Sequence, residues 1–228
     1  MEIYADTADF LQVVWCATDM RISGFTTNPM LMKKAGVKDY EKWARALIAL
    51  APNHCFSFEV LADDFVEMKR QARLICSWGP NVYAKIPSVN SQGMPTYQAV
   101  KSLDSEGLNV NVTCVMTLSD VAAFAECFRS DTRAIVSLFV GRITDTGRNA
   151  ESIVGSALCT LHSQCSARLL WASVRDLTAI EQARRMGVDI ITAPPNVLEK
   201  LDWKDRSLNK VRLDTVREFY EAGKGYTL

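Results

Sequence analysis

The chain has 228 residues, of which 48% are hydrophobic and 23% charged, and its 26 basic and 26 acidic side chains cancel to a formal net charge of zero. This length is enough for a complete hydrophobic core and for an α/β barrel folded as one domain. Because the charges balance and no basic patch interleaved with aromatic residues is present, nucleic acid and membrane surfaces are not expected as main partners.

The amino-terminal segment and the cysteines together predict a cytoplasmic protein. The sequence MEIYADTADF lacks a basic flank followed by an apolar segment, and no apolar run approaches the roughly 18 residues of a membrane helix. The seven cysteines are odd in number and scattered, without the Cys-x-x-Cys spacing of zinc or redox sites. They are therefore predicted to be reduced core residues.

Short β-type runs alternate along the chain with longer amphipathic segments. The predicted strands are Ile3–Asp6, Gly24–Thr27, Cys55–Val60, Val82–Ile86, Val110–Thr113, Ala134–Leu138, Leu169–Ser173 and Asp189–Thr192. Between them apolar side chains recur at helical spacing, as in the sets Tyr40, Trp43, Leu47, Leu50 and Phe65, Met68, Ala72, Ile75 and Val121, Phe124, Ala125, Phe128.

Capping residues support several of these helices. The expected signals are Asp63 or Asp64 before a helix that stops at Gly79-Pro80, a capping box of Thr117 with Asp120, and Gly187 closing a helix that begins near Asp176.

Eight successive βα units predict an α/β protein with a single-domain (β/α)8 barrel over residues 1–228, and an open doubly wound sheet is the alternative. Residues from about 205 to 228 are predicted to form an additional helix and tail.

Polar residues collect where the predicted strands end, which is the face that carries the active site in such barrels. Lys85 is the most unusual of them, because it lies inside the apolar run Tyr83-Ala84-Lys85-Ile86-Pro87. Burial of an ammonium is costly and favours the neutral amine, which can form a Schiff base with a ketone. The alternative is a strand-end lysine that reaches solvent. Asp6 and Glu59, on the first and third strands, can supply the partners that a buried lysine requires.

Other chemistries find less support in the residues. A zinc-dependent aldolase needs converging ligands, but the only histidines are His54, before the third strand, and His162, within a helical segment. Motifs that cradle nucleotide phosphates are absent. The sequence therefore predicts a reaction without a metal or cofactor.

Six motifs in order along the chain resemble the transaldolase family, and most closely its short subfamily, which includes fructose-6-phosphate aldolases. They are Asp6-Thr7-Ala8, Thr26-Thr27-Asn28-Pro29, Lys85-Ile86-Pro87, Asn111-Val112-Thr113, Phe139-Val140-Gly141-Arg142-Ile143 and Ala172-Ser173-Val174-Arg175. The resemblance spans residues 3 to about 200. It implies a class I mechanism in which Lys85 attacks a ketose phosphate.

The resemblance also implies a role for each matching residue. Asp6 is expected to be the acid/base at the C4 hydroxyl, while Glu59 and Thr113 position a catalytic water. The dihydroxyacetone hydroxyls would be held by Asn28, Asn111 and Ser137, with Thr27 and Phe139 also lining the substrate, and the phosphate by Arg142, Ser173 and Arg175. For the two arginines, a solvated pair at the rim is the alternative.

Within the family, the residues favour transfer of a dihydroxyacetone unit to an aldose phosphate over release of free dihydroxyacetone. The short aldolases carry Gln in place of Glu59 and Tyr in place of Phe139. The chain departs from the family pattern at Leu138, at Val174 and in the longer loop Ser88–Tyr97, which could line the acceptor side. A sugar-phosphate-binding pseudoenzyme and a purely structural or interaction protein stay open as alternatives.

The last predicted helix carries an apolar stripe of Leu213, Val216, Phe219 and Tyr220. The stripe either covers its own barrel or crosses to a neighbouring subunit. Since short transaldolases form pentameric rings that pair into decamers, the resemblance implies a homo-oligomer.

Overall fold

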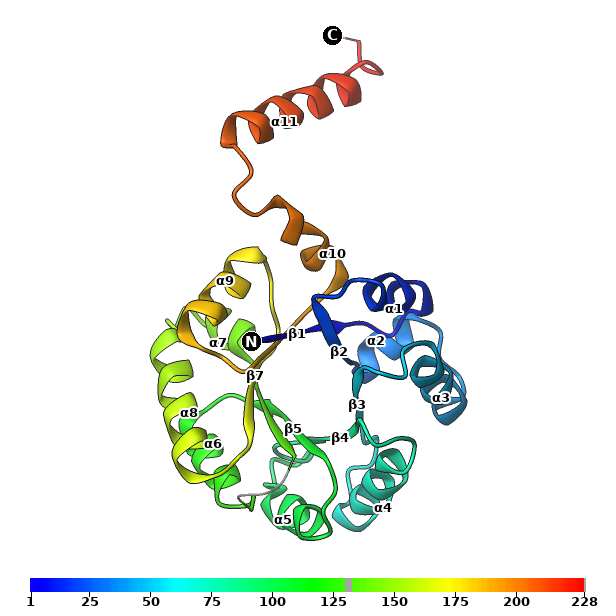
Figure 1. The fold of residues 1–228 in the computed structure, drawn as a ribbon, viewed down its shortest axis with the longest axis vertical. Coiled ribbons are helices and arrows are strands. Elements are labelled where there is room, and N and C mark those ends of the chain that lie inside the picture. Colours follow the sequence, from blue (N-terminus) through cyan, green and yellow to red (C-terminus); the bar gives the residue numbers. More distant parts are fainter. Residues whose placement is uncertain (130–132, 228) are drawn as a thin grey trace. The chain divides into compact units, whose positions relative to one another are not determined.

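The structure, a computed structural model, describes residues 1–129 and 133–227. Leu228, the last residue of the predicted tail, lies outside the described residues. The chain divides into two compact units, Met1–Leu198 and Glu199–Leu228. Within the described residues of the first unit, eight parallel strands pair in sequence order and close into a barrel, because β8 pairs with β1. Helices surround the strands (Figure 1). The predicted (β/α)8 barrel is confirmed.

The strands lie within two residues of their predicted bounds. They are β1 (Glu2–Asp6), β2 (Ile22–Thr26), β3 (Cys55–Glu59), β4 (Val82–Pro87), β5 (Val110–Val115), β6 (Ala134–Leu138), β7 (Arg168–Trp171) and β8 (Ile190–Ala193). The prediction that Ser173 belongs to the seventh strand is wrong. β7 ends at Trp171, and Ser173 has a φ of 65°, a left-handed conformation that cannot continue a strand.

Several helices of the barrel unit begin where the sequence supplies a short polar cap. The helices of this unit are α1 (Phe10–Ala17), α2 (Pro29–Lys34), α3 (Tyr40–Leu50), α4 (Phe65–Cys76), α5 (Tyr97–Ser105), α6 (Leu118–Ala125), α7 (Val140–Thr144), α8 (Glu151–Gln164), α9 (Leu177–Met186) and α10 (Pro195–Leu198). Side chains that accept a backbone N–H at the start of a helix include Asp9, Asn28, Asp39, Asp64, Thr117 and Asp176. Gly187 ends α9 in the left-handed conformation, as predicted. α4 ends at Cys76, before the predicted stop at Gly79.

Side-chain alternation along each strand separates the two faces of the barrel wall. Phe56 and Phe58 of β3 stack on each other, and Phe58 packs against Trp43 of α3, on the outer face. The inner face holds an apolar cluster of Tyr4, Tyr83, Ile135, Leu170, Ala172 and Ile190.

Tyr4 fills the part of this interior nearest the amino-terminal ends of the strands, and Gly24 on the neighbouring strand leaves space for its ring. A Cβ at Gly24 would lie 2.9 Å from the Tyr4 ring and 2.8 Å from the carbonyl oxygen of Cys55. Below the ring, the Tyr4 hydroxyl donates to Glu2 and Arg168 pairs with Glu2 at 2.6 Å. The amino-terminal end of the barrel is thus filled by an aromatic ring above an ion pair.

The second unit contains the short 3-10 helix η1 (Glu199–Trp203) and α11 (Leu208–Gly223). A C-terminal helix was predicted here. Its apolar stripe is solvent-exposed in this chain, since Leu213, Val216, Phe219 and Tyr220 are all 48% or more exposed. None of the described helices combines the length and the apolar character needed to span a lipid bilayer.

Candidate active site

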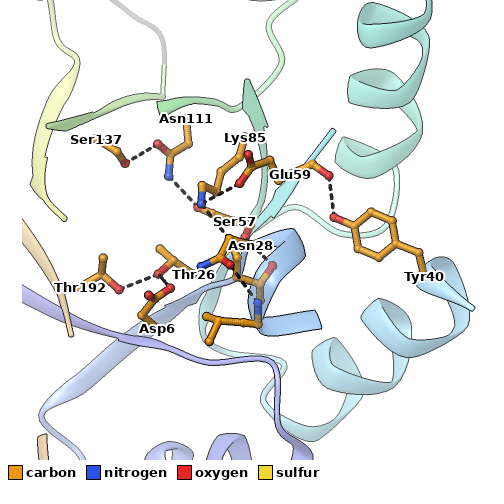
Figure 2. Close-up of polar contacts among 12 residues, drawn as sticks. Asp6, Thr26, Asn28, Tyr40, Ser57, Glu59, Lys85, Asn111, Ser137 and Thr192 are labelled. Carbon is orange, nitrogen blue, oxygen red and sulfur yellow. Dashed lines mark hydrogen bonds and ion pairs between the residues drawn. The ribbon is translucent and has the colours of Figure 1, made fainter. Parts of the chain in front are cut away.

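Lys85 lies at the centre of the polar layer at the carboxyl end of the barrel (Figure 2). It is 5% exposed, and its Nζ donates to the carbonyl oxygen of Thr27 at 2.8 Å and lies 3.2 Å from Glu59 Oε2. Glu59 is the register partner of Lys85 across β3 and β4. The buried ammonium therefore has the paired environment that its burial requires.

Asp6 is the second carboxyl group of this layer. Its Oδ1 accepts a hydrogen bond of 2.9 Å from Thr26 Oγ1, and its register partner on β2 is the same threonine. Burial raises the pKa of Asp6 above its usual value, and the charge of Lys85 and the Thr26 hydrogen bond only partly oppose this effect. Such a carboxyl group can take up and return a proton more readily than an exposed one.

A line of neutral hydrogen bonds fixes the amide of Asn111. Ser137 Oγ donates to Asn111 Oδ1 at 2.7 Å, and Asn111 Nδ2 donates to Ser57 Oγ at 3.0 Å. All three side chains are buried, and Asn111 is the register partner of Lys85. The amide and the two hydroxyls are therefore held next to the lysine with their donors and acceptors in a defined direction.

Two further predicted residues, Thr113 and Asn28, each have a polar group that no other described residue binds. Thr113 is fully buried, and its hydroxyl has no hydrogen-bond partner among the described residues. Since it follows Asn111 by two positions on β5, it faces the same interior. Asn28 caps α2, where its Oδ1 accepts from the backbone N–H of Leu31 at 3.0 Å. Its amino group is therefore the part that remains for a ligand.

The three residues predicted to bind phosphate lie after β6 and β7. Ser173 approaches Gly141 so closely that a Cβ on Gly141 would lie 1.8 Å from the Ser173 carbonyl oxygen. Ser173 and Arg175 line a pocket of about 240 Å³. Arg175 donates to Asp145 at 2.6 Å, and this ion pair is about half-exposed on both sides. Arg142 is exposed on α7 and is not among the residues that line the pocket. Ser173 and Arg175 therefore line one pocket. Arg142 lies outside the lining of this pocket and has no hydrogen-bond or ion-pair partner among the described residues.

Phe139 directly follows β6 and precedes the first residue of α7. It is partly buried and packs against the apolar cluster of the barrel interior. An aromatic ring without a hydroxyl therefore stands where the polar layer meets that cluster.

The predicted long loop Ser88–Tyr97 contains a small hairpin, and its last residue begins α5. Val89 and Pro95 form an antiparallel bridge, and Asn90 Oδ1 accepts from two backbone N–H groups of the tip. Asp63 binds the tip through the N–H of Ser91 at 2.6 Å and its hydroxyl at 2.8 Å, and these bonds lower the pKa of Asp63. Asp64, rather than Asp63, caps α4, so the two predicted alternatives have separate roles.

Four residues that were not predicted for the site contact its members. Ser57 binds Asn111, Thr192 binds Thr26, Tyr40 donates to the backbone carbonyl of Glu59 at 2.8 Å, and Asp145 holds Arg175. The sequence did indicate a place for Ser57, because it precedes Glu59 by two positions and so lies on the same face of the strand. Among the described residues, no group of three or more histidine, cysteine, aspartate or glutamate side chains is placed to share a metal ion.

Comparisons with known proteins show the family of this chain. Residues 3–225 match the family model described as Transaldolase/Fructose-6-phosphate aldolase. A protein named "Probable transaldolase" from Dehalococcoides mccartyi is 31% identical over 203 residues, covering 88% of this chain and 90% of that protein. Another of the same name from Nitrosopumilus maritimus is 31% identical over 227 residues, covering 98% and 96%.

Solved structures with a similar fold have little sequence identity to this chain. The 3-hexulose-6-phosphate synthase from Salmonella typhimurium aligns with a TM-score of 0.57 at 15% identity, covering 85% of this chain and 89% of that one. Dihydrodipicolinate synthase from Rhodopseudomonas palustris aligns with a TM-score of 0.54 at 12% identity, covering 97% and 79%. At these identities the likeness concerns the barrel alone.

Proposed function

This chain belongs to the transaldolase/fructose-6-phosphate aldolase family, and we propose that it is a class I transaldolase. The proposed reaction moves a dihydroxyacetone unit from a ketose phosphate, such as fructose 6-phosphate or sedoheptulose 7-phosphate, to an aldose phosphate. The observation that carries the proposal is the buried Lys85, which has Glu59 3.2 Å away and Asp6 in the same layer. A purely structural protein would not need so costly a group of charges.

The first steps belong to Lys85. After passing its proton toward Glu59, the neutral amine adds to the C2 carbonyl and forms a carbinolamine, which loses water to give an iminium. Glu59 and the unpartnered hydroxyl of Thr113 are the groups proposed to hold the water that carries protons in this step. The carbonyl oxygen of Thr27 orients Nζ by accepting one of its hydrogens.

Asp6 is proposed to act in cleavage of the C3–C4 bond. It takes the proton of the C4 hydroxyl while the bond's electron pair moves into the iminium, which leaves an enamine on Lys85 and releases an aldose phosphate. The raised pKa of Asp6 suits this exchange, because the group must also return the proton to the new alkoxide when the acceptor adds.

Binding roles follow the positions of the remaining residues. The fixed amide of Asn111, the hydroxyl of Ser137 and the amino group of Asn28 are proposed to hold the dihydroxyacetone hydroxyls, so that the enamine stays in place until an acceptor arrives. Ser173, Arg175 and Arg142 are proposed to bind phosphate with charge-assisted hydrogen bonds.

Release of free dihydroxyacetone, as by a fructose-6-phosphate aldolase, is the second candidate, because the matching family model covers both activities. Two residues favour transfer. Glu59 supplies an ionisable carboxyl group beside Lys85, and Phe139 supplies an apolar ring where a tyrosine would offer a hydroxyl to water.

The test is borohydride reduction in the presence of fructose 6-phosphate. We expect irreversible inactivation and a reduced dihydroxyacetone unit on Lys85, unaffected by EDTA, and no labelling of Lys85→Met. Product formation with and without erythrose 4-phosphate then separates transfer from release. An unlabelled, active protein would refute the class I mechanism, and equal rates of dihydroxyacetone release with and without acceptor would favour the aldolase.

We also propose that the protein is a homo-oligomer, a pentamer or decamer, that uses α11. The exposed stripe of Leu213, Val216, Phe219 and Tyr220 supports this proposal, since an apolar helix face of this kind is usually covered in solution.

A further inference from the structure

Two buried threonine hydroxyls meet inside the barrel, one from each strand that flanks β1. Thr26 on β2 and Thr192 on β8 are 166 residues apart in sequence, yet their Oγ1 atoms lie 2.6 Å apart. Both side chains are buried, and Thr26 Oγ1 also contacts Asp6 Oδ1 at 2.9 Å. Figure 2 shows the resulting chain from Thr192 through Thr26 to Asp6.

The number of protons in this chain fixes its direction. When Asp6 is ionised, its carboxylate can only accept, so Thr26 gives its single hydroxyl proton to Asp6 Oδ1. Thr26 then has no proton for Thr192, and two oxygens at 2.6 Å need a proton between them. Thr192 is therefore the donor of that hydrogen bond, and both hydroxyl protons point toward Asp6.

We propose that Thr192 is a positioning residue for Asp6: by donating to Thr26 Oγ1, its hydroxyl holds Thr26 in place and strengthens the hydrogen bond that Thr26 donates to Oδ1, which leaves Oδ2 as the atom that exchanges a proton with substrate. No partner of Asp6 Oδ2 is found among the described residues, which agrees with this division of the two oxygens. Only the naming of Oδ2 as the exchanging atom rests on the proposed function. The direction of the hydrogen bonds does not.

The groups that act on Asp6 come from several strands. Lys85 of β4 and the hydroxyl of Thr26 favour the ionised form, whereas burial and the charge of Glu59 on β3 favour the protonated form. Thr192 is the polar contributor of β8 to this chain, and it acts through Thr26. A weaker Thr26 hydrogen bond should therefore raise the pKa of Asp6 further.

Three substitutions at position 192 separate the hydroxyl from the side-chain volume. In Thr192→Val, a methyl group would stand 2.6 Å from Thr26 Oγ1, and because carbon and oxygen need well over 3 Å, Thr26 must move off Asp6. Thr192→Ala removes the donor without a clash, so it keeps the test available if the valine variant does not fold. Thr192→Ser restores the hydroxyl.

The experiment is a carbon-13 NMR titration of the Asp6 carboxyl group in substrate-free protein, with the signal assigned by its loss in Asp6→Asn. We expect Thr192→Val, in which Thr26 moves off Asp6, to titrate about half a pKa unit or more above the unmodified protein, Thr192→Ala to titrate above it by a smaller amount because the Thr26 hydrogen bond is weakened, and Thr192→Ser to titrate near it. Thr96→Ala is the matched control, since it also removes a buried threonine hydroxyl but one that donates to Pro87. An unchanged Asp6 titration in Thr192→Ala, or an equal shift in Thr96→Ala, would overturn the proposal.

A kinetic arm distinguishes this inference from the proposed function. If fructose 6-phosphate is cleaved, Thr192→Ala should lower kcat with little change in KM, and the pH profile should move with the Asp6 titration. A shifted Asp6 titration in a protein that never cleaves ketose phosphates would sustain the positioning role and reject the enzyme assignment. Cleavage of ketose phosphate by Thr192→Ala with an unchanged Asp6 titration and an unchanged pH profile would sustain the enzyme assignment and reject the positioning role.

Discussion

Replacement of Lys85 by methionine tests the ion pair between Lys85 and Glu59 in the polar layer. Methionine keeps much of the volume of the lysine stem but removes the cation 3.2 Å from Glu59. At that separation two unit charges interact by about 5 kcal/mol for an effective dielectric constant of about 20. Loss of one partner of a buried pair typically costs about 3–5 kcal/mol, a large part of the stability of an ordinary domain.

The expected loss depends on Glu59, because the variant keeps this buried carboxyl group without the cation that pairs with it. Adding Glu59→Gln to Lys85→Met should restore much of the stability at pH 8, because the uncompensated charge is gone. Urea unfolding of the four proteins of this cycle at pH 8 measures the effect.

The exposed Lys101 on α5 provides the control, since Lys101→Met should change stability by no more than about 0.5 kcal/mol. If Lys85→Met is as stable as the unmodified protein at pH 8, and Glu59→Gln brings no recovery in its background, the assigned pairing is wrong.

Four further outcomes are expected. Asp6→Asn should abolish turnover yet stabilise the barrel, because an acid with a raised folded-state pKa lowers stability as the pH rises from its unfolded value through its folded one; a thermal-melting gain at pH 4 as large as at pH 8 would contradict this. Arg142→Ala and Arg175→Ala should each raise KM for phosphorylated sugars by about 10- to 150-fold, equivalent to about 1.5–3 kcal/mol, while equal losses on unphosphorylated sugars would refute phosphate binding. Phe139→Tyr should increase free dihydroxyacetone relative to transfer product, and an unchanged ratio in a coupled assay would remove the ring from the water-exclusion argument. Deletion from Ser207 onward should dissociate a large homo-oligomer in light scattering, and a monomeric full-length protein would argue against a role of α11 in assembly.

Much of the barrel and its polar layer could be predicted because both depend on local patterns. Period-two alternation places Lys85 inside the barrel with Tyr83, and Glu59 with Ser57, whichever strands become neighbours. The in-order pairing of strands then makes Glu59 and Lys85 adjacent, as βα units of this length generally dictate.

Other contacts depend on closure and on backbone conformation, which the sequence does not display. The hydrogen bond between Thr26 and Thr192 exists only because the first and last strands meet, and neither threonine stands out within its apolar run. The left-handed turn at Ser173 and its approach to Gly141 are set by how two loops pack. The sequence predicts that Thr27 lines the substrate, but it does not reveal that the backbone carbonyl of Thr27 contacts Lys85, because a residue type says little about a backbone role.

The Tyr4 ring above Gly24 has a kinetic consequence for a two-substrate reaction in this barrel. Since the ring and the ion pair of Glu2 with Arg168 fill the amino-terminal end, both sugars would have to enter and leave through the carboxyl-terminal end of the barrel. In the proposed transfer reaction, the aldose released from the donor would occupy the space that the acceptor needs, and it would have to diffuse out before the second sugar could reach the enamine. Initial-rate plots against one sugar at several fixed concentrations of the other should therefore give the parallel lines of a ping-pong enzyme.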